Sequence, residues 1–307
     1  MQYPAAMDSE PDSLDADCGE IIPLTRPRRP RFGDYELLAP LARGGMCTVH
    51  LAAHVQTGER VAIKALDPAF TSHPEVTQRL VGELSVARAS RHPGVVAVHA
   101  AGCTRAGVPY LVMEYLPGRS LSAIADEARL PFDAICALGG QIAASVAAMH
   151  AAGYVHCDIK PENVIVVDAP QSSACAQTKL VDFGVSRRVD EAVPEDSGIA
   201  GTPAYMAPEQ WRGEPVRASD VYALGCVLYE LITGSMPFAG SLPELMHAHR
   251  EARPPRPSWL RDHVPPALER LVLRALAKDP RDRPTMLELA RDLERVECFD
   301  RQLAIAS

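Results

Sequence analysis

The sequence lacks the features that mark membrane-spanning, secreted and metal-scaffold proteins. No stretch approaches the roughly 20 uninterrupted apolar residues of a membrane span, and no basic-then-apolar secretory signal begins the chain. The eight cysteines show no paired metal-ligand spacing, and Cys136 and Cys226 lie in apolar helical patterns that suit reduced core thiols. We therefore expect a cytoplasmic protein with no membrane span, no disulfide framework and no zinc site.

Positive charge is also scarce. The net charge of −8 argues against nucleic acid as a partner, because nucleic-acid binders need a concentrated basic surface. Residues 1 to about 20 are acidic and polar, and arginines and prolines alternate over 26–31. This composition predicts a disordered tail over residues 1–33. The tail is either a docking segment for a partner or a solvated, charge-balanced leader.

Lysine occurs only four times, as Lys64, Lys160, Lys179 and Lys278. Lys160 lies between Asp158 and Asn163 in the run VHCDIKPEN (155–163), and Asp182-Phe183-Gly184 follows shortly after. One aspartate can accept a proton from an attacking hydroxyl, and a lysine can neutralise a transferring phosphoryl group. An asparagine and a second aspartate can hold a metal ion. Together these residues indicate phosphoryl transfer from ATP.

This spacing resembles the catalytic loop and metal-binding motif of the eukaryotic-type protein kinases, in the form seen in their Ser/Thr branch. The resemblance implies that Asp158 is the base and that Lys160 acts on the γ-phosphate. It also implies that Asn163 and Asp182 hold Mg²⁺, with Mn²⁺ as an alternative ion. ATP is then the phosphoryl donor.

The N-terminal motifs of such kinases follow in the expected order. Two strand-like runs flank a glycine turn at 41–52, which resembles the phosphate-covering loop, although only Gly44 of its three glycines is present. Ala42 and Cys47 stand at the other two positions. Lys64 ends the apolar run 61–64, and the resemblance pairs it with Glu83 on a helix. Lys64 and Lys160 thus occupy the two catalytic lysine positions of the family.

The segment 109–118 resembles the hinge between the two kinase lobes. The adenine edge would bond to backbone groups of Glu114 and Leu116, with Met113 controlling access behind the base. The nucleotide-binding residues that the resemblance implies are Leu41, Gly44, Val49, Ala62, Lys64, Met113, Glu114 and Leu116.

The run GTPAYMAPE (201–209) resembles the end of the kinase activation segment, and its sequence is most similar to that of bacterial Ser/Thr kinases. The resemblance implies that Thr202 is a catalytic-site residue that hydrogen-bonds to Asp158 and Lys160. It also implies an ion pair between Glu209 and Arg283.

Two further positions bear on structure and regulation. Asp220 would accept hydrogen bonds from the catalytic-loop backbone, which would offset the free-energy cost of burying its carboxylate.

Cys157 stands where regulated kinases usually carry an arginine that binds a phosphorylated activation loop. We predict that activity does not require a docked phosphoresidue. The hydroxyl candidates between 184 and 201 are Ser186 and Ser197.

The predicted fold class is α+β, a bilobal protein kinase fold with a small β-rich N-lobe and a larger α-helical C-lobe. We expect a kinase domain over 34–298 (N-lobe about 34–114, C-lobe about 118–298) and a short C-terminal tail over 299–307. Helices are predicted at 131–152, 218–233, 241–250, 265–277 and 285–297, and a lengthened hairpin at 169–178.

The predicted function is transfer of the ATP γ-phosphoryl group to Ser/Thr hydroxyls of proteins, including the chain itself. The alternative is a pseudokinase-like module that binds nucleotide or partners with little turnover, because Ala42 and Cys47 would stiffen or crowd the phosphate loop. A kinase of small molecules is a third hypothesis. The segment around Thr202 disfavours it, since in the family this segment shapes the peptide-acceptor site.

Overall fold

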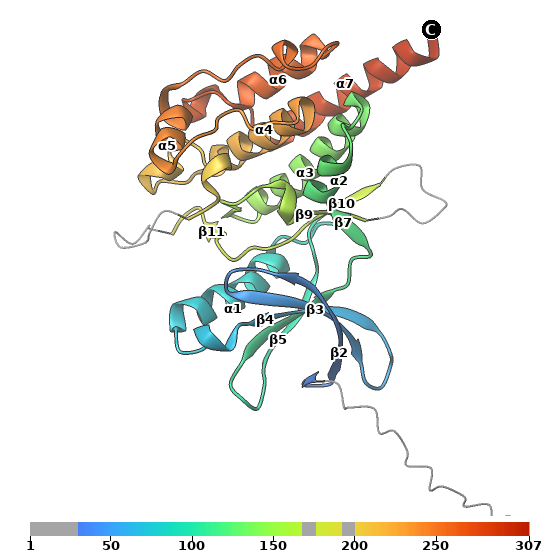
Figure 1. The fold of residues 1–307 in the computed structure, drawn as a ribbon, viewed down its shortest axis with the longest axis vertical. Coiled ribbons are helices and arrows are strands. Elements are labelled where there is room, and N and C mark those ends of the chain that lie inside the picture. The colour runs from blue at the N-terminus through green and yellow to red at the C-terminus, as the bar shows by residue number, and fades with distance from the viewer. Residues whose placement is uncertain (1–29, 168–175, 192–199, 307) are drawn as a thin grey trace, which may run out of the picture.

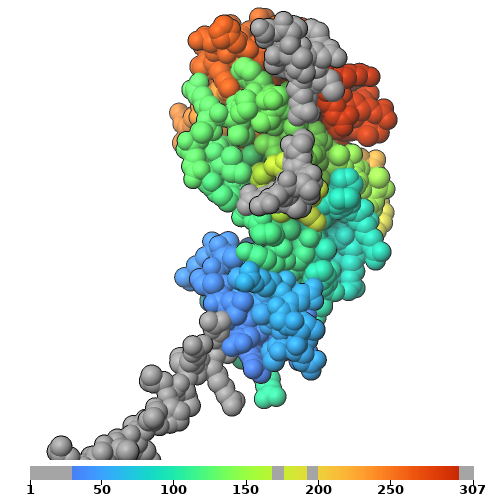
Figure 2. Space-filling model, turned by 90° about the vertical axis from the view of Figure 1, so that its right-hand side faces the viewer, coloured from blue at the N-terminus to red at the C-terminus, as the bar shows by residue number. Residues whose placement is uncertain are grey.

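The computed structural model describes residues 30–167, 176–191 and 200–306, with side chains up to Val296. A strand-rich half and a helix-rich half form two lobes (Figures 1 and 2), so the predicted α+β bilobal architecture is confirmed. Most of the predicted tail and its docking role lie outside the described residues, as do Ser197 and most of the excursion at 169–178.

The small lobe is built on a six-stranded antiparallel sheet with the strand order β1-β2-β3-β4-β6-β5. The strands are β1 (Arg31–Phe32), β2 (Tyr35–Arg43), β3 (Cys47–His54), β4 (Arg60–Leu66), β5 (Val98–Cys103) and β6 (Pro109–Glu114). β1 pairs with Tyr35 and Glu36, so regular structure begins before the expected boundary at residue 34.

β4 is buried on both faces from Val61 to Leu66 and lies between β3 and β6 in the sheet. Its apolar run explains this position, since a strand that contacts the core on both faces cannot alternate with polar residues. Helix α1 (Pro74–Ala89) begins with a proline at its first turn and packs on β5 and β6. Ala52, Val61, Ile63, Ala65, Tyr110 and Val112 form a separate small core on the other side of the sheet.

The described part of the large lobe contains the helices α2 (Leu121–Glu127), α3 (Phe132–Ala151), α4 (Arg217–Thr233), α5 (Leu242–Glu251), α6 (Pro266–Ala275) and α7 (Met286–Ala306). α3 packs against α4 and α7, and α4 contacts α6 (Figure 1). Four of the five predicted helices match within two residues at each end. The fifth continues to Ala306, so the helix expected over 285–297 extends through most of the segment expected to be a tail.

Local capping explains several helix ends. Ser241 and Glu244 form a capping box at the start of α5, and α4 ends at Gly234 with φ 76°. At the start of α7, Thr285 and Glu288 satisfy each other's backbone N–H groups.

Short strands place the catalytic segments between the lobes. β9 (Val164–Val167) pairs with β10 (Gln177–Leu180) and β7 (Gly118–Ser120), which confirms a hairpin after the catalytic loop. β8 (Tyr154–Val155) pairs with β11 (Arg187–Arg188). These ladders hold residues 156–163 and 181–186 beside each other.

Helix α3 is long and apolar enough to cross a membrane by length and composition, although Asp133, Gln141 and His150 interrupt its apolar run. In the structure 56% of the qualifying window is buried. α3 packs between α4 and α7 and contacts β10. A buried core helix passes the same test as a membrane span, so α3 is weak evidence for one.

Candidate active site

One buried carboxylate, that of Asp220, binds the backbone at the start of the catalytic loop. Asp220 on α4 accepts the backbone N–H of His156 at 2.8 Å and that of Cys157 at 2.9 Å. The ring of His150 adds a third contact, with 2.8 Å between its Nε2 and the Asp220 carboxylate. Three partners offset the desolvation of this carboxylate, whose residue is 1% exposed. The predicted role of Asp220 as a backbone acceptor is confirmed.

Asp158, Lys160 and Thr202 form one hydrogen-bonded cluster. Thr202 Oγ1 donates to Asp158 Oδ1 at 2.6 Å, and Lys160 Nζ donates to Thr202 Oγ1 at 2.7 Å. Lys160 Nζ also lies 2.9 Å from Asp158 Oδ2. The structure therefore brings these three predicted site residues together, although 42 or more positions separate Thr202 from the other two.

A second cluster joins the lobes. Lys64 on β4 donates to Glu83 Oε1 on α1 at 2.6 Å and to Asp182 Oδ1 at 2.8 Å. Lys64 and Glu83 are buried, whereas the Asp182 side chain is about half exposed. Asp182 adopts φ 65°, which turns its carboxylate toward the lysine and lets it accept Gly184 N–H. The predicted Lys64–Glu83 contact is therefore present.

The charges of this cluster are mutually dependent. Burial raises the pKa of Glu83 to about 7, against the opposing effect of Lys64. Burial alone would lower the pKa of Lys64, but Glu83 and Asp182 outweigh it and raise the pKa above its usual value. Burial acts to raise the pKa of Asp182, and Lys64 more than offsets it. Lys64 and Asp182 are thus charged at neutral pH, while Glu83 titrates near it.

The two residues expected to hold a metal ion lie at the same catalytic segments. Asn163 Nδ2 donates to the Asp158 carbonyl at 2.9 Å and to its carboxylate at 3.2 Å, so the amide oxygen is left for another partner. Among the described residues, Asp182 contacts Lys64 and the Gly184 N–H through one carboxylate oxygen, Oδ1. Within the described ranges there is no group of three or more His, Cys, Asp or Glu side chains suited to a metal.

The glycine turn around Gly44 connects β2 to β3. Gly44 N–H donates to Cys47 O at 2.8 Å, and the sheet register sets Val49 opposite Lys64 and Leu51 opposite Ala62. Leu41, on β2, is 46% exposed. Burial raises the pKa of the Cys47 thiol. The loop therefore carries a protonated thiol beside the lysine cluster.

The hinge residues end β6. Met113 lies opposite Ala62 in the sheet register. Glu114 donates its backbone N–H to Ala97 O, and Leu116 makes no hydrogen bond within the described part of the chain. The backbone at Leu116 is thus available to another group.

The predicted pair between Glu209 and Arg283 is confirmed and forms two hydrogen bonds, at 2.6 and 3.0 Å. Both side chains are almost fully buried. Gln210, next in sequence, donates to the Cys157 carbonyl at 2.9 Å. The segment that carries Thr202 is therefore attached both to the catalytic loop and to the large lobe.

Sequence reasoning missed some supporting side chains. Neither His150, which contacts Asp220, nor Gln210 has a local pattern that predicts its partner. Lys179 pairs with Glu114 at 2.7 Å and joins the hinge to β10. The scarcity of lysine singled out Lys179 in the sequence but did not indicate its partner.

Comparison with known proteins adds independent information. A family model described as "Protein kinase domain" matches residues 35–293. The chain is 38% identical to the serine/threonine-protein kinase Pkn1 of Myxococcus xanthus over 270 residues, which cover 87% of this chain and 38% of that protein.

Two mycobacterial proteins show similar identity. The serine/threonine-protein kinase PknB of Mycobacterium leprae is 37% identical over 277 residues (87% of this chain, 44% of that protein). PknB of Mycobacterium tuberculosis is 38% identical over 273 residues (85% and 42%). The chain thus spans less than half the length of these relatives.

Proposed function

Because the chain belongs to the protein kinase family, we propose that it transfers the γ-phosphoryl group of ATP to Ser/Thr hydroxyls of proteins, including its own. The observation that carries this proposal is the assembled cluster of Asp158, Lys160 and Thr202, in which Thr202 Oγ1 lies 2.6 Å from Asp158 Oδ1. The names of the relatives support the Ser/Thr class of acceptor.

In the proposed reaction, Asp158 accepts the proton of the acceptor hydroxyl as its oxygen attacks the γ-phosphorus. The bond from the γ-phosphorus to the bridging oxygen breaks, and ADP leaves. Lys160 offsets the charge on the transferring group. Thr202 fixes the positions of both side chains through hydrogen bonds of 2.6 Å to Asp158 and 2.7 Å to Lys160. Little rearrangement is therefore needed when the substrates bind.

The proposed nucleotide site extends from the lysine cluster to the hinge. Lys64, fixed by Glu83, would contact the α- and β-phosphates, and the turn at Gly44 would cover them with backbone N–H groups. The open backbone at Leu116 supports an adenine contact there. The remaining proposed contacts are Leu41, Val49, Ala62, Met113 and the backbone of Glu114.

Protein kinases use ATP with a divalent metal ion. We assign the ion to Asn163 and Asp182 and propose Mg²⁺, with Mn²⁺ as the alternative. The free amide oxygen of Asn163 and the carboxylate of Asp182 are hard oxygen donors that fit such an ion, which would take its other ligands from phosphate and water. When bound, the ion neutralises phosphate charge during the transfer.

Cys157 supports a distinct proposal about regulation. Its side chain is 5% exposed, and its thiol faces the carbonyl of Val155. It supplies no charge for a phosphoresidue, so activity should not depend on phosphorylation of Ser186 or Ser197. The double variant S186A/S197A should retain most of the transfer rate, and a nearly complete loss would contradict this proposal.

The function is tested by incubating the full chain with labelled ATP, Mg²⁺ or Mn²⁺ and a mixture of protein acceptors. Phosphoserine and phosphothreonine should form with wild type, and Asp158→Ala should abolish their formation. R105Q, which changes an exposed turn far from the cluster, is the matched control. Nucleotide binding without any transfer to protein would favour the pseudokinase alternative, and transfer only to a small molecule would favour the third hypothesis.

A further inference from the structure

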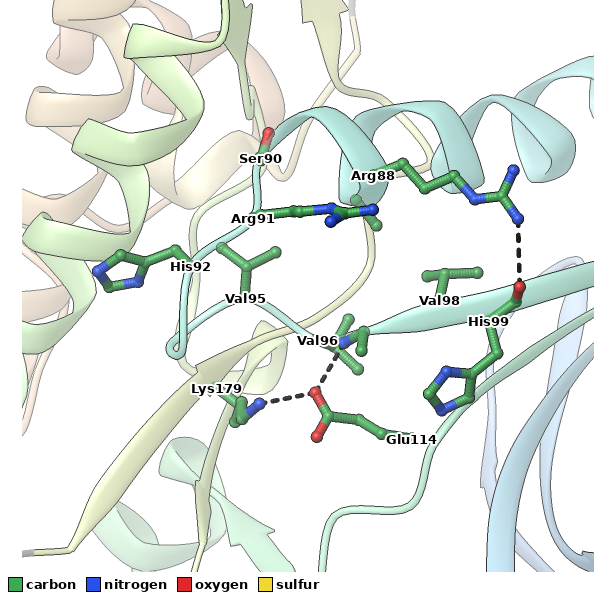
Figure 3. Close-up of a pocket in the computed structure, with 12 residues that line it drawn as sticks. Arg88, Ser90, Arg91, His92, Val95, Val96, Val98, His99, Glu114 and Lys179 are labelled. Carbon is green, nitrogen blue, oxygen red and sulfur yellow. Dashed lines mark hydrogen bonds and ion pairs between the residues drawn. The ribbon is translucent and has the colours of Figure 1, made fainter.

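Lys179 lies outside the clusters assigned to phosphoryl transfer and yet connects two of the segments that carry them. It belongs to β10, three residues before Asp182. Its Nζ donates to Glu114 Oε1 at 2.7 Å, and Glu114 is the last residue of β6. Figure 3 shows this contact and a second hydrogen bond to the same oxygen, from the backbone of the loop that follows α1. The pair therefore joins the hinge to the strand that leads to Asp182.

The neighbours of Lys179 are attached to different elements of the fold. Thr178 N–H donates to the side-chain oxygen of Gln141 on α3 at 2.8 Å. Leu180 exchanges backbone hydrogen bonds of 2.7 and 3.0 Å with the loop over 94–96. β10 is thus fixed relative to both lobes, so the lysine that it carries has a well-defined starting point.

On the hinge side, Glu114 is attached through its backbone and through its side chain. Its N–H donates to Ala97 O at 2.9 Å, and its Oε1 accepts the Ala97 N–H at 2.7 Å. The same Oε1 accepts Lys179 Nζ. The sheet ends here, and the backbone at Leu116 lies two residues further along the chain. Lys179 therefore adds a charge-assisted hydrogen bond where the ladder of β6 stops.

The pair is more protected from water than a surface ion pair. The side chains of Lys179 and Glu114 are 18% and 26% exposed, whereas Arg295, which pairs with Asp292 on α7, is 78% exposed. Exposed pairs contribute little, because solvent and salt screen their charges. A less exposed pair with a short contact is screened less, so its loss should affect the backbone that it holds.

We propose that Lys179 and the Glu114 side chain are positioning residues for nucleotide binding, because their ion pair keeps the hinge backbone in the orientation that binds adenine. The inference rests on the proposed function, which assigns adenine to this backbone. Neither side chain touches the nucleotide. Without the pair the hinge samples other orientations, and the apparent affinity falls in proportion to the fraction of molecules that keep the binding orientation.

The variants separate charge, shape and fold. K179M removes the charge and keeps an unbranched side chain, and K179R keeps the charge. E114Q retains an oxygen that can accept the Ala97 N–H but loses the negative charge. R295M is the matched control, because it also removes a cation from an ion pair, here an exposed one in the large lobe. Circular dichroism and urea unfolding check the fold of each protein.

Adenosine is the probe, titrated by calorimetry without metal. It carries the base that the hinge would bind and has no phosphate for Lys64 or for a metal ion. Wild type, K179R and R295M should bind it equally, and K179M roughly three- to tenfold more weakly. E114Q should be affected less than K179M, since its amide oxygen can still accept from the lysine. The double variant K179M/E114Q should be no weaker than K179M, because both changes break one contact.

The outcomes distinguish this inference from the proposed function. Adenosine affinity that is unchanged in K179M, or lowered in the double variant by the product of the two single effects, would overturn the inference and leave the proposed function standing. A lower unfolding free energy in K179M with unchanged adenosine affinity would show that the pair only stabilises the fold. Wild type that fails to bind adenosine would overturn the adenine site itself and the inference with it.

Hydrogen exchange gives a second readout that needs no ligand. Backbone amides over 113–118 should exchange faster in K179M than in wild type, K179R or R295M, because the hinge opens more often. Amides of α6 should exchange equally in all four proteins. Equal exchange over 113–118 would show that the hinge does not depend on Lys179 and would overturn the inference.

Discussion

Replacing Glu83 by glutamine should change how stability depends on pH. The Glu83 carboxyl is 4% exposed, and burial raises its pKa to about 7 from a value of 4.5 in the unfolded chain. A carboxyl with a higher pKa in the folded state holds its proton more strongly there. The folded state therefore loses stability relative to the unfolded state as the pH rises through this window. Glutamine keeps the shape and hydrogen bond but cannot titrate.

The size of the effect follows from the same shift. A pKa raised from 4.5 to about 7 corresponds to about 3 kcal/mol at 1.36 kcal/mol per unit. The partners of Glu83 do not titrate in this range, because the pKa of Asp182 is lowered from 3.8 and that of Lys64 is raised from 10.5. The unfolding free energy of wild type should thus fall relative to that of E83Q by up to about 3 kcal/mol between pH 4.5 and 8.

The assay is urea unfolding of both proteins at several pH values from 5 to 8, followed by circular dichroism and tryptophan fluorescence. Coincident transitions justify a two-state analysis. E127Q is the control, since Arg119 holds the pKa of the exposed Glu127 below its usual value and the group stays ionised throughout. A difference between wild type and E83Q that is constant across this range would refute the reasoning.

Two further predictions concern named contacts. Thr202→Val removes the hydroxyl between Asp158 and Lys160, and the lost charged hydrogen bonds should lower kcat/KM roughly 10- to 100-fold. T202S should keep most of the activity, and equal rates for all three proteins would contradict a role for this hydroxyl. Arg283→Lys should destabilise the fold by roughly 2–4 kcal/mol in urea unfolding, because a lysine cannot reproduce the paired bonds to Glu209 and the bonds to three backbone carbonyls. Unchanged stability would show that these bonds contribute little.

The sequence predicted those parts of the protein whose chemistry is local. The catalytic run around Asp158 and the apolar run that leads into Lys64 are each short and carry their own residue pattern. The resemblance to the protein kinases then predicted contacts such as Lys64 with Glu83 and Glu209 with Arg283, which the structure shows. The helix ends were predictable where prolines, glycines or capping residues mark them, as at Gly234.

The remaining features depend on packing that no local pattern encodes. β1 forms because Arg31 and Phe32 pair with β2, and α7 continues past the predicted end at 297. An open pocket beside the end of α1 brings together Arg91 and Lys179, which are far apart in the sequence. The apolar character of α3 is explained by its burial between other helices, which the sequence alone does not distinguish from a membrane span.

Intact-mass analysis after incubation with ATP and Mg²⁺ tests the catalytic assignment most directly. Wild type and Asp158→Ala are treated identically, with Thr202→Ser as a matched conservative variant in the same cluster. We predict added phosphates on wild type and T202S and none on D158A. If D158A gains phosphate as wild type does, or if wild type binds nucleotide yet phosphorylates neither itself nor any protein acceptor, the proposed catalytic role of Asp158 is contradicted.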